Sequence, residues 1–413
     1  MNSFHKIFSI VLACLSLAAV SGCAQKESDF CRAYTDYWAD DYSGPLGIQK
    51  GELNGEPVMM LAGRPMYLAG LNCYDLFVGA DNRDFSHIYA TLELLKEQKC
   101  PIIRFNCGVY GPNEMDVYFN DREGYLAKVD TIGAVADRCH ILLVPSFFWQ
   151  IKSLPQRFGE IYGAWGDPES QTYKAMQQYT ADIVNTLKSH KSAAIWECGN
   201  EFNLDCNAHP ESPVTPSDIN ACYKEYARIC TECDPDHRMI TGGNSLMRNV
   251  QWHLAHETEP IGDFQTYIDN HAKHDSYAQY LEISSLFNPD NMDAVSEHCY
   301  YNTDTPDHIY NPWRAFSDRE IPLVLAEAVA CCKQAAVDIG KVYFVGEFHC
   351  ASVVSEEKMI ENYEAFLANK VQLTLAWNFS RTGIIECSFS ADTPEGVATF
   401  NAMREYNRKM SEW

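Results

Sequence analysis

Short apolar runs alternate with amphipathic helical stretches along most of this 413-residue chain. In 85–95, apolar residues recur at Phe85, Ile88, Leu92 and Leu95, which is the period of a helix with one buried face. The apolar runs themselves are typical of parallel strands that helices cover on both faces. Eight of them are predicted strands: 66–72, 102–106, 141–144, 193–196, 238–244, 294–300, 342–347 and 371–377. Eight such strands alternating with helices predict an α/β fold, a closed (β/α)8 TIM barrel.

An open, doubly wound sheet is the alternative fold, but no glycine-rich phosphate-binding loop follows the first strand. Before the barrel, Gly63-Arg64-Pro65 interrupts the run 58–68, which predicts an N-terminal hairpin. Residues 31–51 are polar and aromatic without a clear period, and we expect a leader packed on the outside. The long segment 246–292 after the fifth strand is predicted to be an insertion that forms a lid or a cleft wall.

The first residues predict an export signal. Lys6 precedes an apolar run, 7–20, that is too short for a membrane-spanning helix. Val20-Ser21-Gly22-Cys23 resembles the bacterial lipoprotein box, which implies cleavage before Cys23 and acylation of its thiol; an ordinary secretory signal is the alternative. The polar residues 25–29 are similar to the export tags of Bacteroides surface lipoproteins. We therefore predict a signal peptide at 1–22, a tether and leader at 23–51, a barrel domain at 52–413, and an outer-membrane or cell-surface lipoprotein of a Gram-negative bacterium.

Charge and cysteine content narrow the possible partners. A net charge of −24 argues against nucleic acid and anionic polysaccharide, because both require lysine and arginine contacts. Aromatic residues make up 12% of the chain, and their faces suit neutral sugars. Of 17 cysteines, several, including Cys73, Cys107 and Cys198, lie in or at the ends of apolar runs, where a thiol acts as a small hydrophobe, and most are expected to be unpaired or irregularly paired. Cys230-x-x-Cys233 and Cys331-Cys332 have no second pair at zinc-site spacing, which argues against a metal site. We predict no metal, no cofactor and a monomer bound to the membrane only through its lipid.

Polar and aromatic residues gather at the carboxyl ends of the predicted strands, where such barrels keep their chemistry. Two of them, Glu201 and Glu347, are carboxylates that each follow an apolar run, which suits general acid/base work on a hydroxylated substrate. The other candidates, all predicted to contact substrate except the first, are Asn72, Arg104, Trp149, Asn200, Asn244, His298, Tyr300 and Trp377.

The order and spacing of these residues carry a resemblance. Arg104 in Ile-Arg-Phe, Trp-Glu-Cys-Gly-Asn-Glu ending at Glu201, His298-Cys-Tyr300, Gly-Glu347-Phe and finally Trp377 resemble a clan A glycoside hydrolase, closest to family 5 and its mannanase-like members. The resemblance covers 58 to about 377, essentially the whole barrel. One departure is Phe202, where the family usually has proline after the acid/base residue, so that the loop after the fourth strand is expected to differ.

The resemblance implies that Glu201 is the acid/base and Glu347 the nucleophile. It also implies that Asn200 binds the sugar 2-hydroxyl and that Trp377 forms the floor of the subsite for the reacting sugar. On physical grounds, Arg104 and the Tyr300 hydroxyl are expected to keep the nucleophile ionised. Four purely structural alternatives stay open: Glu197 and Glu297 as buried packing or salt-linked acids, Arg104 as a buried ion pair, His298 as a core histidine, and Trp149 as a packing aromatic.

The sequence therefore predicts a retaining glycosidase for a neutral β-glycan, with β-1,4-mannan as the first candidate and β-1,4-glucan as the second. The carboxyl groups of such an enzyme lie about 5–5.5 Å apart, against about 6.5–9.5 Å in an inverting enzyme. A non-catalytic glycan-binding surface lipoprotein is the alternative from another class. A metal-dependent barrel hydrolase is disfavoured, because the chain lacks His-x-His on the expected strands.

Overall fold

The computed structural model describes residues 29–77, 85–108, 112–206, 208–209, 211–244, 247, 250–257, 261, 266–267, 274–300, 324–350, 355–381 and 387–413, with 112–114 and 350 described in backbone only. The predicted signal peptide and Cys23 lie outside these residues. No helix in the described part of the chain is both long enough and apolar enough to cross a bilayer.

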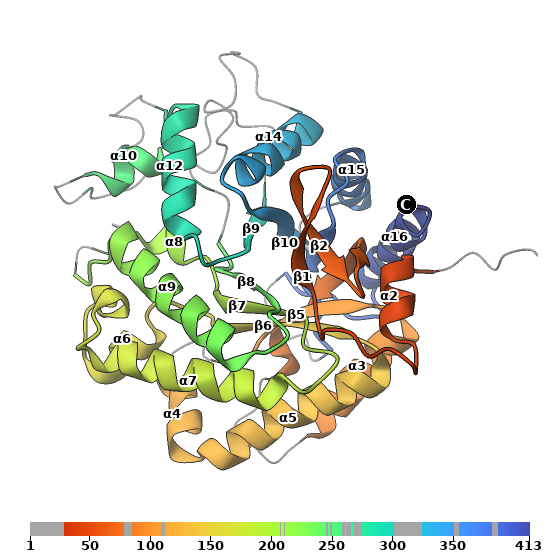
Figure 1. The fold of residues 1–413 in the computed structure, drawn as a ribbon, viewed down its shortest axis with the longest axis horizontal. Helices are drawn as coiled ribbons and strands as arrows, with labels where there is room; N and C mark the ends of the chain where they lie inside the picture. Colours follow the sequence, from red (N-terminus) through yellow and green to blue (C-terminus); the bar gives the residue numbers. More distant parts are fainter. Residues whose placement is uncertain are drawn as a thin grey trace, which may run out of the picture.

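The predicted barrel is confirmed. Eight strands close on themselves in the order β10-β11-β4-β5-β6-β7-β8-β9, and each pairs with its neighbours in parallel (Figure 1). They are β4 (Leu68–Asn72), β5 (Ile102–Asn106), β6 (Leu142–Phe148), β7 (Ile195–Gly199), β8 (Met239–Thr241), β9 (Ala294–Cys299), β10 (Val342–Cys350) and β11 (Leu373–Trp377). The register pairs Asn72 with Arg104 and Glu347 with His298, which brings strand-end residues side by side.

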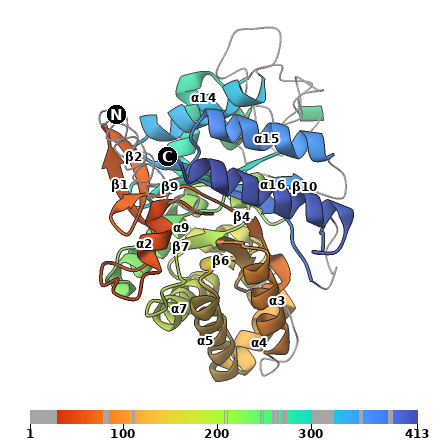
Figure 2. The same ribbon diagram turned by 90° about the vertical axis from the view of Figure 1, so that its right-hand side faces the viewer.

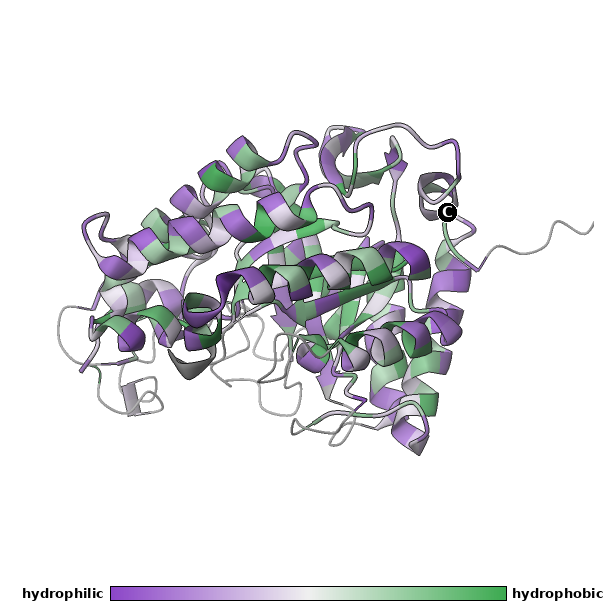
Figure 3. Cartoon of the chain, turned by 90° about the horizontal axis from the view of Figure 1, so that it is seen from below, coloured by the Kyte–Doolittle hydropathy of each residue, from purple (hydrophilic) through white to green (hydrophobic). Residues whose placement is uncertain are grey.

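Helices surround the strands on the outside (Figures 1 and 2). Figure 3, coloured by residue hydropathy, shows hydrophobic residues concentrated toward the strands and hydrophilic residues along the outer helices. Local signals start several helices; Thr215 and Asp218 form a capping box with Pro216 at the first turn of α9. The helices are α3 (Ser86–Glu97), α4 (Pro112–Asn120), α5 (Arg122–Cys139), α6 (Ser153–Phe158), α7 (Gln171–Leu187), α8 (Phe202–Asp205), α9 (Pro216–Cys233), α10 (Gln251–Ala255), α12 (Tyr277–Phe287), α14 (Leu325–Asp338), α15 (Glu356–Ala368) and α16 (Pro394–Met410), with 3-10 turns η1 (Tyr74–Leu76) and η2 (Tyr162–Gly166).

The N-terminal segment closes the amino-terminal end of the barrel. It contains α2 (Arg32–Tyr37) and a three-stranded antiparallel sheet of β1 (Gln49–Leu53), β2 (Glu56–Leu61) and β3 (Arg64–Pro65). The predicted hairpin is β2-β3, whereas the predicted domain boundary at residue 52 falls inside β1. Ile48 is fully buried; its N–H donates to Ala194 O and its carbonyl accepts from Met239 N, at 3.0 and 2.8 Å. The expected outer leader is therefore partly core.

The predicted insertion after the fifth strand is too long, because its last part is a regular barrel helix. Within α12, Tyr280, Ile283 and Phe287 are buried, and the helix packs against α9 and α14. Helix α12 thus follows β8 as the other outer helices follow their strands. Of the remaining segment, α10 is described, and many of the residues between it and Asp275 lie outside the described part.

Several cysteines in apolar runs act as small core side chains. Cys73, Cys107 and Cys198 are buried free thiols, as the sequence predicted. Burial raises the pKa of each of these thiols well above the ordinary cysteine range, so they stay protonated. Cys387 is disulfide-bonded.

Candidate active site

The carboxyl ends of the barrel strands bring most of the predicted residues together. Asn72 ends β4, Arg104 lies on β5, His298 on β9, Glu347 on β10 and Trp377 ends β11. Trp149 directly follows β6, Asn200 and Glu201 follow β7, and Tyr300 follows β9. The structure does not bring Asn244 into this cluster. Its buried amide accepts from the Tyr223 hydroxyl at 2.9 Å and donates to Phe287 O at 3.0 Å, which ties it to the helix layer.

Glu347 is held by one hydrogen bond on each carboxylate oxygen. Arg104 Nη1 donates to Oε1 at 2.6 Å, and the Tyr300 hydroxyl donates to Oε2 at 2.9 Å. Both contacts match the prediction from the sequence. Only 5% of the residue is exposed, and this burial raises the pKa of the Glu347 carboxyl, whereas the nearby His298 and Arg104 act in the opposite direction. A buried carboxylate with few water contacts and fixed donors is suited to attack rather than to proton exchange.

Arg104 is the centre of the polar network. The residue is fully buried, and its guanidinium also donates to Glu197 Oε1 at 2.5 Å, to Asn72 Oδ1 at 3.0 Å and to Asn200 Oδ1 at 2.8 Å. The expectation that Glu197 is a salt-linked acid is thereby confirmed. The role of Asn72 could not be specified from the sequence, because its link to Arg104 depends on the pairing of β4 with β5.

Glu201 stands at the start of the short helix α8, with φ of 57° in the left-handed region. Its N–H donates to Gly243 O at 2.8 Å, which fixes this turn against the loop after β8. The departure at Phe202 has a local explanation: the ring is buried and packs on Trp165 and Tyr223, with ring centroids 5.4 and 6.3 Å away. The Glu201 side chain is 29% exposed, against 6% for Glu347, so that only Glu201 has ready access to water.

His298 connects the two carboxylates. Its Nδ1 lies 2.9 Å from Glu201 Oε1 and 3.6 Å from Glu347 Oε2. One carboxylate oxygen of each glutamate and one nitrogen of His298 lie within 4.8 Å of one another. Of the described residues, these three come nearest to a set that could hold a cation, and their own hydrogen bonds account for the arrangement. The sequence indicated His298 as a sugar contact or a core residue, and did not show that it faces Glu201.

An aromatic wall, formed by Tyr74, Trp149 and Trp377, stands beside the carboxylates. The Trp149 ring lies 4.9 Å from Tyr74 and 5.9 Å from Trp377 between centroids, and the Arg104 guanidinium lies 4.6 Å from the Trp149 centroid. Trp149 is buried, whereas Trp377 is partly exposed. Of the two tryptophans, Trp377 is therefore the one that solvent reaches, whereas Trp149 packs against Arg104. Tyr74 was not predicted from the sequence as a site residue. Its position two residues after Asn72, which ends β4, could have indicated it.

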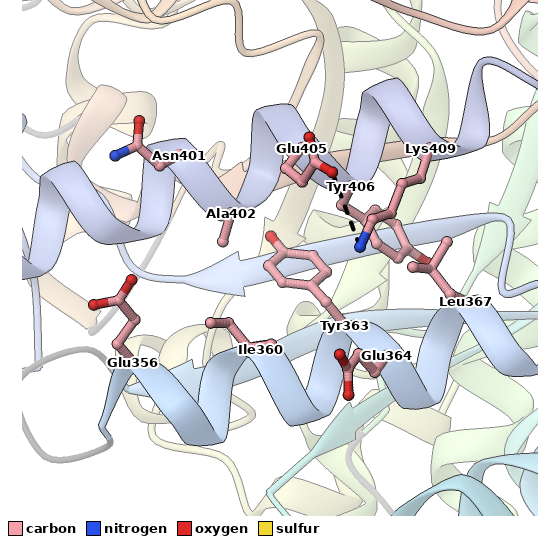
Figure 4. Close-up of a pocket in the computed structure, with 10 residues that line it drawn as sticks. All are labelled: Glu356, Ile360, Tyr363, Glu364, Leu367, Asn401, Ala402, Glu405, Tyr406 and Lys409. Carbon is pink, nitrogen blue, oxygen red and sulfur yellow. Dashed lines mark ion pairs between the residues drawn. The ribbon is translucent and has the colours of Figure 1, made fainter.

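A groove on the outer surface lies far from this chemistry. It has a volume of about 310 Å³ and lies between α15 and α16, on the outside of the barrel (Figure 4). Tyr363 and Tyr406 pack against each other there, and Lys409 faces Glu405. No pair of facing carboxylates with an arginine lies among the described residues that line it, and we assign it no catalytic role.

A closed barrel with two facing glutamates at the carboxyl ends of β7 and β10 defines the class of a glycosidase-type (β/α)8 protein. The family follows from comparison with known proteins. The family model described as Cellulase (glycosyl hydrolase family 5) matches residues 62–383. The chain therefore belongs to glycosyl hydrolase family 5, which confirms the resemblance found in the sequence and implies a carbohydrate substrate.

Solved structures are similar in fold. A family 5 mannosidase from Rhizomucor miehei, in complex with mannosyl-fructose, has a TM-score of 0.54 at 12% identity over 88% of this chain and 99% of that chain. The β-mannanase of the blue mussel Mytilus edulis has a TM-score of 0.54 at 13% identity over 90% and 97%. The β-1,4-D-mannanase of Cryptopygus antarcticus has a TM-score of 0.53 at 12% identity over 90% and 95%. No curated protein matches the chain.

Proposed function

We propose that this family 5 hydrolase cleaves β-linked neutral glycans with retention of anomeric configuration. The observation that carries the proposal is the approach of Glu201 and Glu347 across the barrel mouth, with an oxygen of each inside a 4.8 Å cluster. A retaining enzyme needs carboxyl groups about 5–5.5 Å apart, because an inverting enzyme must leave room for a water at about 6.5–9.5 Å. The short approach supports a direct attack by one carboxylate.

In this mechanism Glu347 attacks the anomeric carbon while Glu201 donates a proton to the leaving oxygen, and the glycosidic bond breaks. The glycosyl-enzyme ester is then hydrolysed by a water that Glu201 deprotonates. Arg104 and Tyr300 hold the attacking carboxylate. Asn200, whose Oδ1 accepts from Arg104 Nη2, binds the sugar 2-hydroxyl in this proposal. His298 contacts the residue whose proton is transferred.

β-1,4-Mannan is the first substrate candidate and β-1,4-glucan the second. Mannan is supported by the similar solved structures, whose names are those of mannosidases and mannanases. Glucan is supported by the description of the family model as a cellulase. The net charge of −24 favours a neutral chain over a uronate-bearing one. The intact pair of glutamates gives no support to a non-catalytic glycan-binding protein.

The test is hydrolysis of a panel of β-mannan, β-glucan and aryl β-glycosides, followed by proton NMR of the first sugar released. We expect the substrate's own anomer to appear first and to mutarotate later. Glu347→Gln is the matched control, and should show no turnover because no other described carboxylate reaches the same position. An inverted first product would exclude the retaining mechanism, and no hydrolysis across the panel would refute the proposed substrate class.

A further inference from the structure

Arg104 is shared between two carboxylates, and only one of them faces the substrate. Its Nη1 binds the Glu347 nucleophile, whereas its Nε binds Glu197 at 2.5 Å. Both contacts are shielded from bulk solvent, since Arg104 and Glu197 are fully buried. One guanidinium charge therefore balances two carboxylates when both are ionised, so that Glu347 has less than a full counterion.

The planar guanidinium makes its donors geometrically dependent on one another. Glu197 fixes the Nε corner and Trp149 covers the group at 4.6 Å, so the directions of Nη1 and Nη2 follow. Those two nitrogens contact Glu347 and Asn200, the groups with proposed roles in attack and in binding the 2-hydroxyl. A displacement of Nε would therefore also displace the two nitrogens that donate to Glu347 and Asn200.

The contacts of the Glu197 carboxylate point to Arg104 as its main partner. It projects into the barrel interior, and among the residues that the structure describes no donor serves its Oε2. Gly243 approaches so closely that a Cβ there would lie 2.8 Å from Glu197 Cδ, which confines the carboxylate to the Arg104 side. Removing a carboxylate from water costs free energy, and among the described residues only Arg104 offsets that cost for Glu197. We therefore look for the role of Glu197 in its effect on Arg104.

We infer that Glu197 is a positioning residue for the proposed glycosidase reaction: it orients Arg104 and shares its charge, and so sets the basicity of the Glu347 nucleophile. This inference rests on the proposed function. Among the described residues, the charged and titratable groups that face Glu347 are Arg104 from β5, Glu201 after β7, His298 from β9 and Tyr300 after β9. Glu197 acts on it through the first of these.

Glu197→Gln tests the charge, because the amide oxygen can still accept from Nε. With one anion removed, Arg104 stabilises ionised Glu347 more strongly. The acidic limb of the pH profile of kcat/KM should therefore shift to lower pH by roughly one unit, the size of shift that one nearby charge produces. The value of kcat should fall about tenfold, since a weaker base is a weaker nucleophile, with KM little changed. Glu197→Asp tests the position: it keeps the charge but shortens the reach, and should lower kcat with the acidic limb in place.

Glu297→Gln is the matched control. Glu297 is also a buried strand glutamate and is next to His298 in the sequence, but it contacts Tyr280 in the outer layer. Its substitution should leave the acidic limb unchanged. The titration of Glu347 itself, followed by carbon-13 NMR of side-chain-labelled glutamate and assigned with Glu347→Gln, needs no substrate. The NMR titration therefore tests this inference even if the proposed function is wrong. Failure of the proposed function would appear separately, as a lack of hydrolysis by the wild type.

A lower pKa for Glu347 in Glu197→Gln, but not in Glu297→Gln, supports the inference. An unchanged Glu347 titration in folded Glu197→Gln overturns it, and so does a loss of thermal stability alone. If Glu197→Gln does not fold, Glu197→Asp decides: wild-type kcat in that variant overturns the inference, and a lowered kcat with unchanged KM supports it.

Discussion

At the scale of single residues, the turn that carries Glu201 depends on a neighbouring glycine. Gly243 has φ of 70°, and its carbonyl accepts the Glu201 N–H at 2.8 Å. A Cβ at this position would lie 2.0 Å from Gly199 O. Two constraints therefore act together at Gly243, a backbone conformation that L-residues avoid and a contact with backbone that cannot yield.

We predict that Gly243→Ala lowers the free energy of unfolding by about 3 kcal/mol or more, from strain and overpacking together. Gly340→Ala is the control, because Gly340 has φ of 73° but nothing within 4 Å of the added Cβ. That variant should lose only about 1–2 kcal/mol, the cost of the left-handed conformation. Urea unfolding of the two variants measures the difference, and equal losses would show that the contact with Gly199 is unimportant.

Removal of the acid/base side chain should separate the two halves of the proposed reaction. In Glu201→Ala, substrates with good leaving groups need no proton and should still form the glycosyl-enzyme, whereas the natural glycan should be cleaved at least a hundredfold more slowly. Azide should accelerate turnover of the activated aryl glycoside and yield a glycosyl azide with the substrate's configuration. Rescue in Glu347→Gln instead of Glu201→Ala would reverse the assignment of the two roles.

Glu297 makes stability depend on pH. Burial raises the pKa of this carboxyl to about 7, although the Tyr280 hydroxyl donates to it at 3.1 Å. Between its ordinary value of 4.5 and about 7, the native state holds a proton that the unfolded chain has released, so that stability falls as pH rises through this window. Glu297→Gln resembles the protonated form and should be more stable than the wild type at pH 8, by about 2–3 kcal/mol. The advantage should vanish near pH 4.5 in thermal or urea unfolding; a constant difference at all pH values would contradict the assignment.

At the scale of elements, the segment after β8 contains two parts with different expected roles. Helix α12 buries Tyr280, Ile283 and Phe287 against the barrel, whereas the residues before it were predicted to wall the cleft. Replacement of 251–274 by a short linker should therefore keep the fold, change KM or preference for long glycans, and leave a small aryl glycoside largely unaffected.

A deletion that extends through α12 is the control for that experiment, because it removes a buried face and should prevent folding. Circular dichroism and thermal unfolding distinguish the two deletion variants. If the shorter deletion already unfolds the protein, the segment before α12 is structural and the cleft-wall hypothesis fails.

At the scale of the whole molecule, the two ends of the barrel have separate tasks. The amino-terminal end is closed by α2 and the β1-β3 sheet; Tyr37 there donates to Lys191 O at 2.6 Å and accepts from Gly47 N at 2.8 Å. The carboxyl-terminal end holds the paired glutamates. Substitutions at the closed end are therefore expected to change stability more than turnover, as is general for this architecture.

We also propose that the chain is anchored at the cell surface through an acylated Cys23. Wild-type protein should then fractionate with membranes and Cys23→Ala with the soluble fraction, because stable anchoring requires acyl chains that only the lipidated terminus carries. Both forms should have equal activity on a small aryl glycoside. Equal solubility of the two forms would remove the anchoring proposal and leave an ordinary secretory signal.

Much of this architecture was determined by the sequence alone. Strands that are buried on both faces are continuous apolar runs, so all eight could be recognised from local composition. Their carboxyl ends must meet at one rim once the barrel closes, and for that reason Glu201 and Glu347 could be paired although 146 positions separate them in the printed numbering.

Only the tertiary structure decided which strand-end side chains meet. Glu197 and Glu297 are both glutamates within barrel strands, yet Glu197 binds Arg104 inside the barrel and Glu297 binds Tyr280 outside it. Asn244 turned toward the helices, His298 toward Glu201, and Tyr74 joined the aromatic wall. The physical reason is that strand register, barrel closure and helix packing are set by contacts between residues far apart in the chain, and no local pattern records which face of a strand a side chain will occupy when both faces are buried.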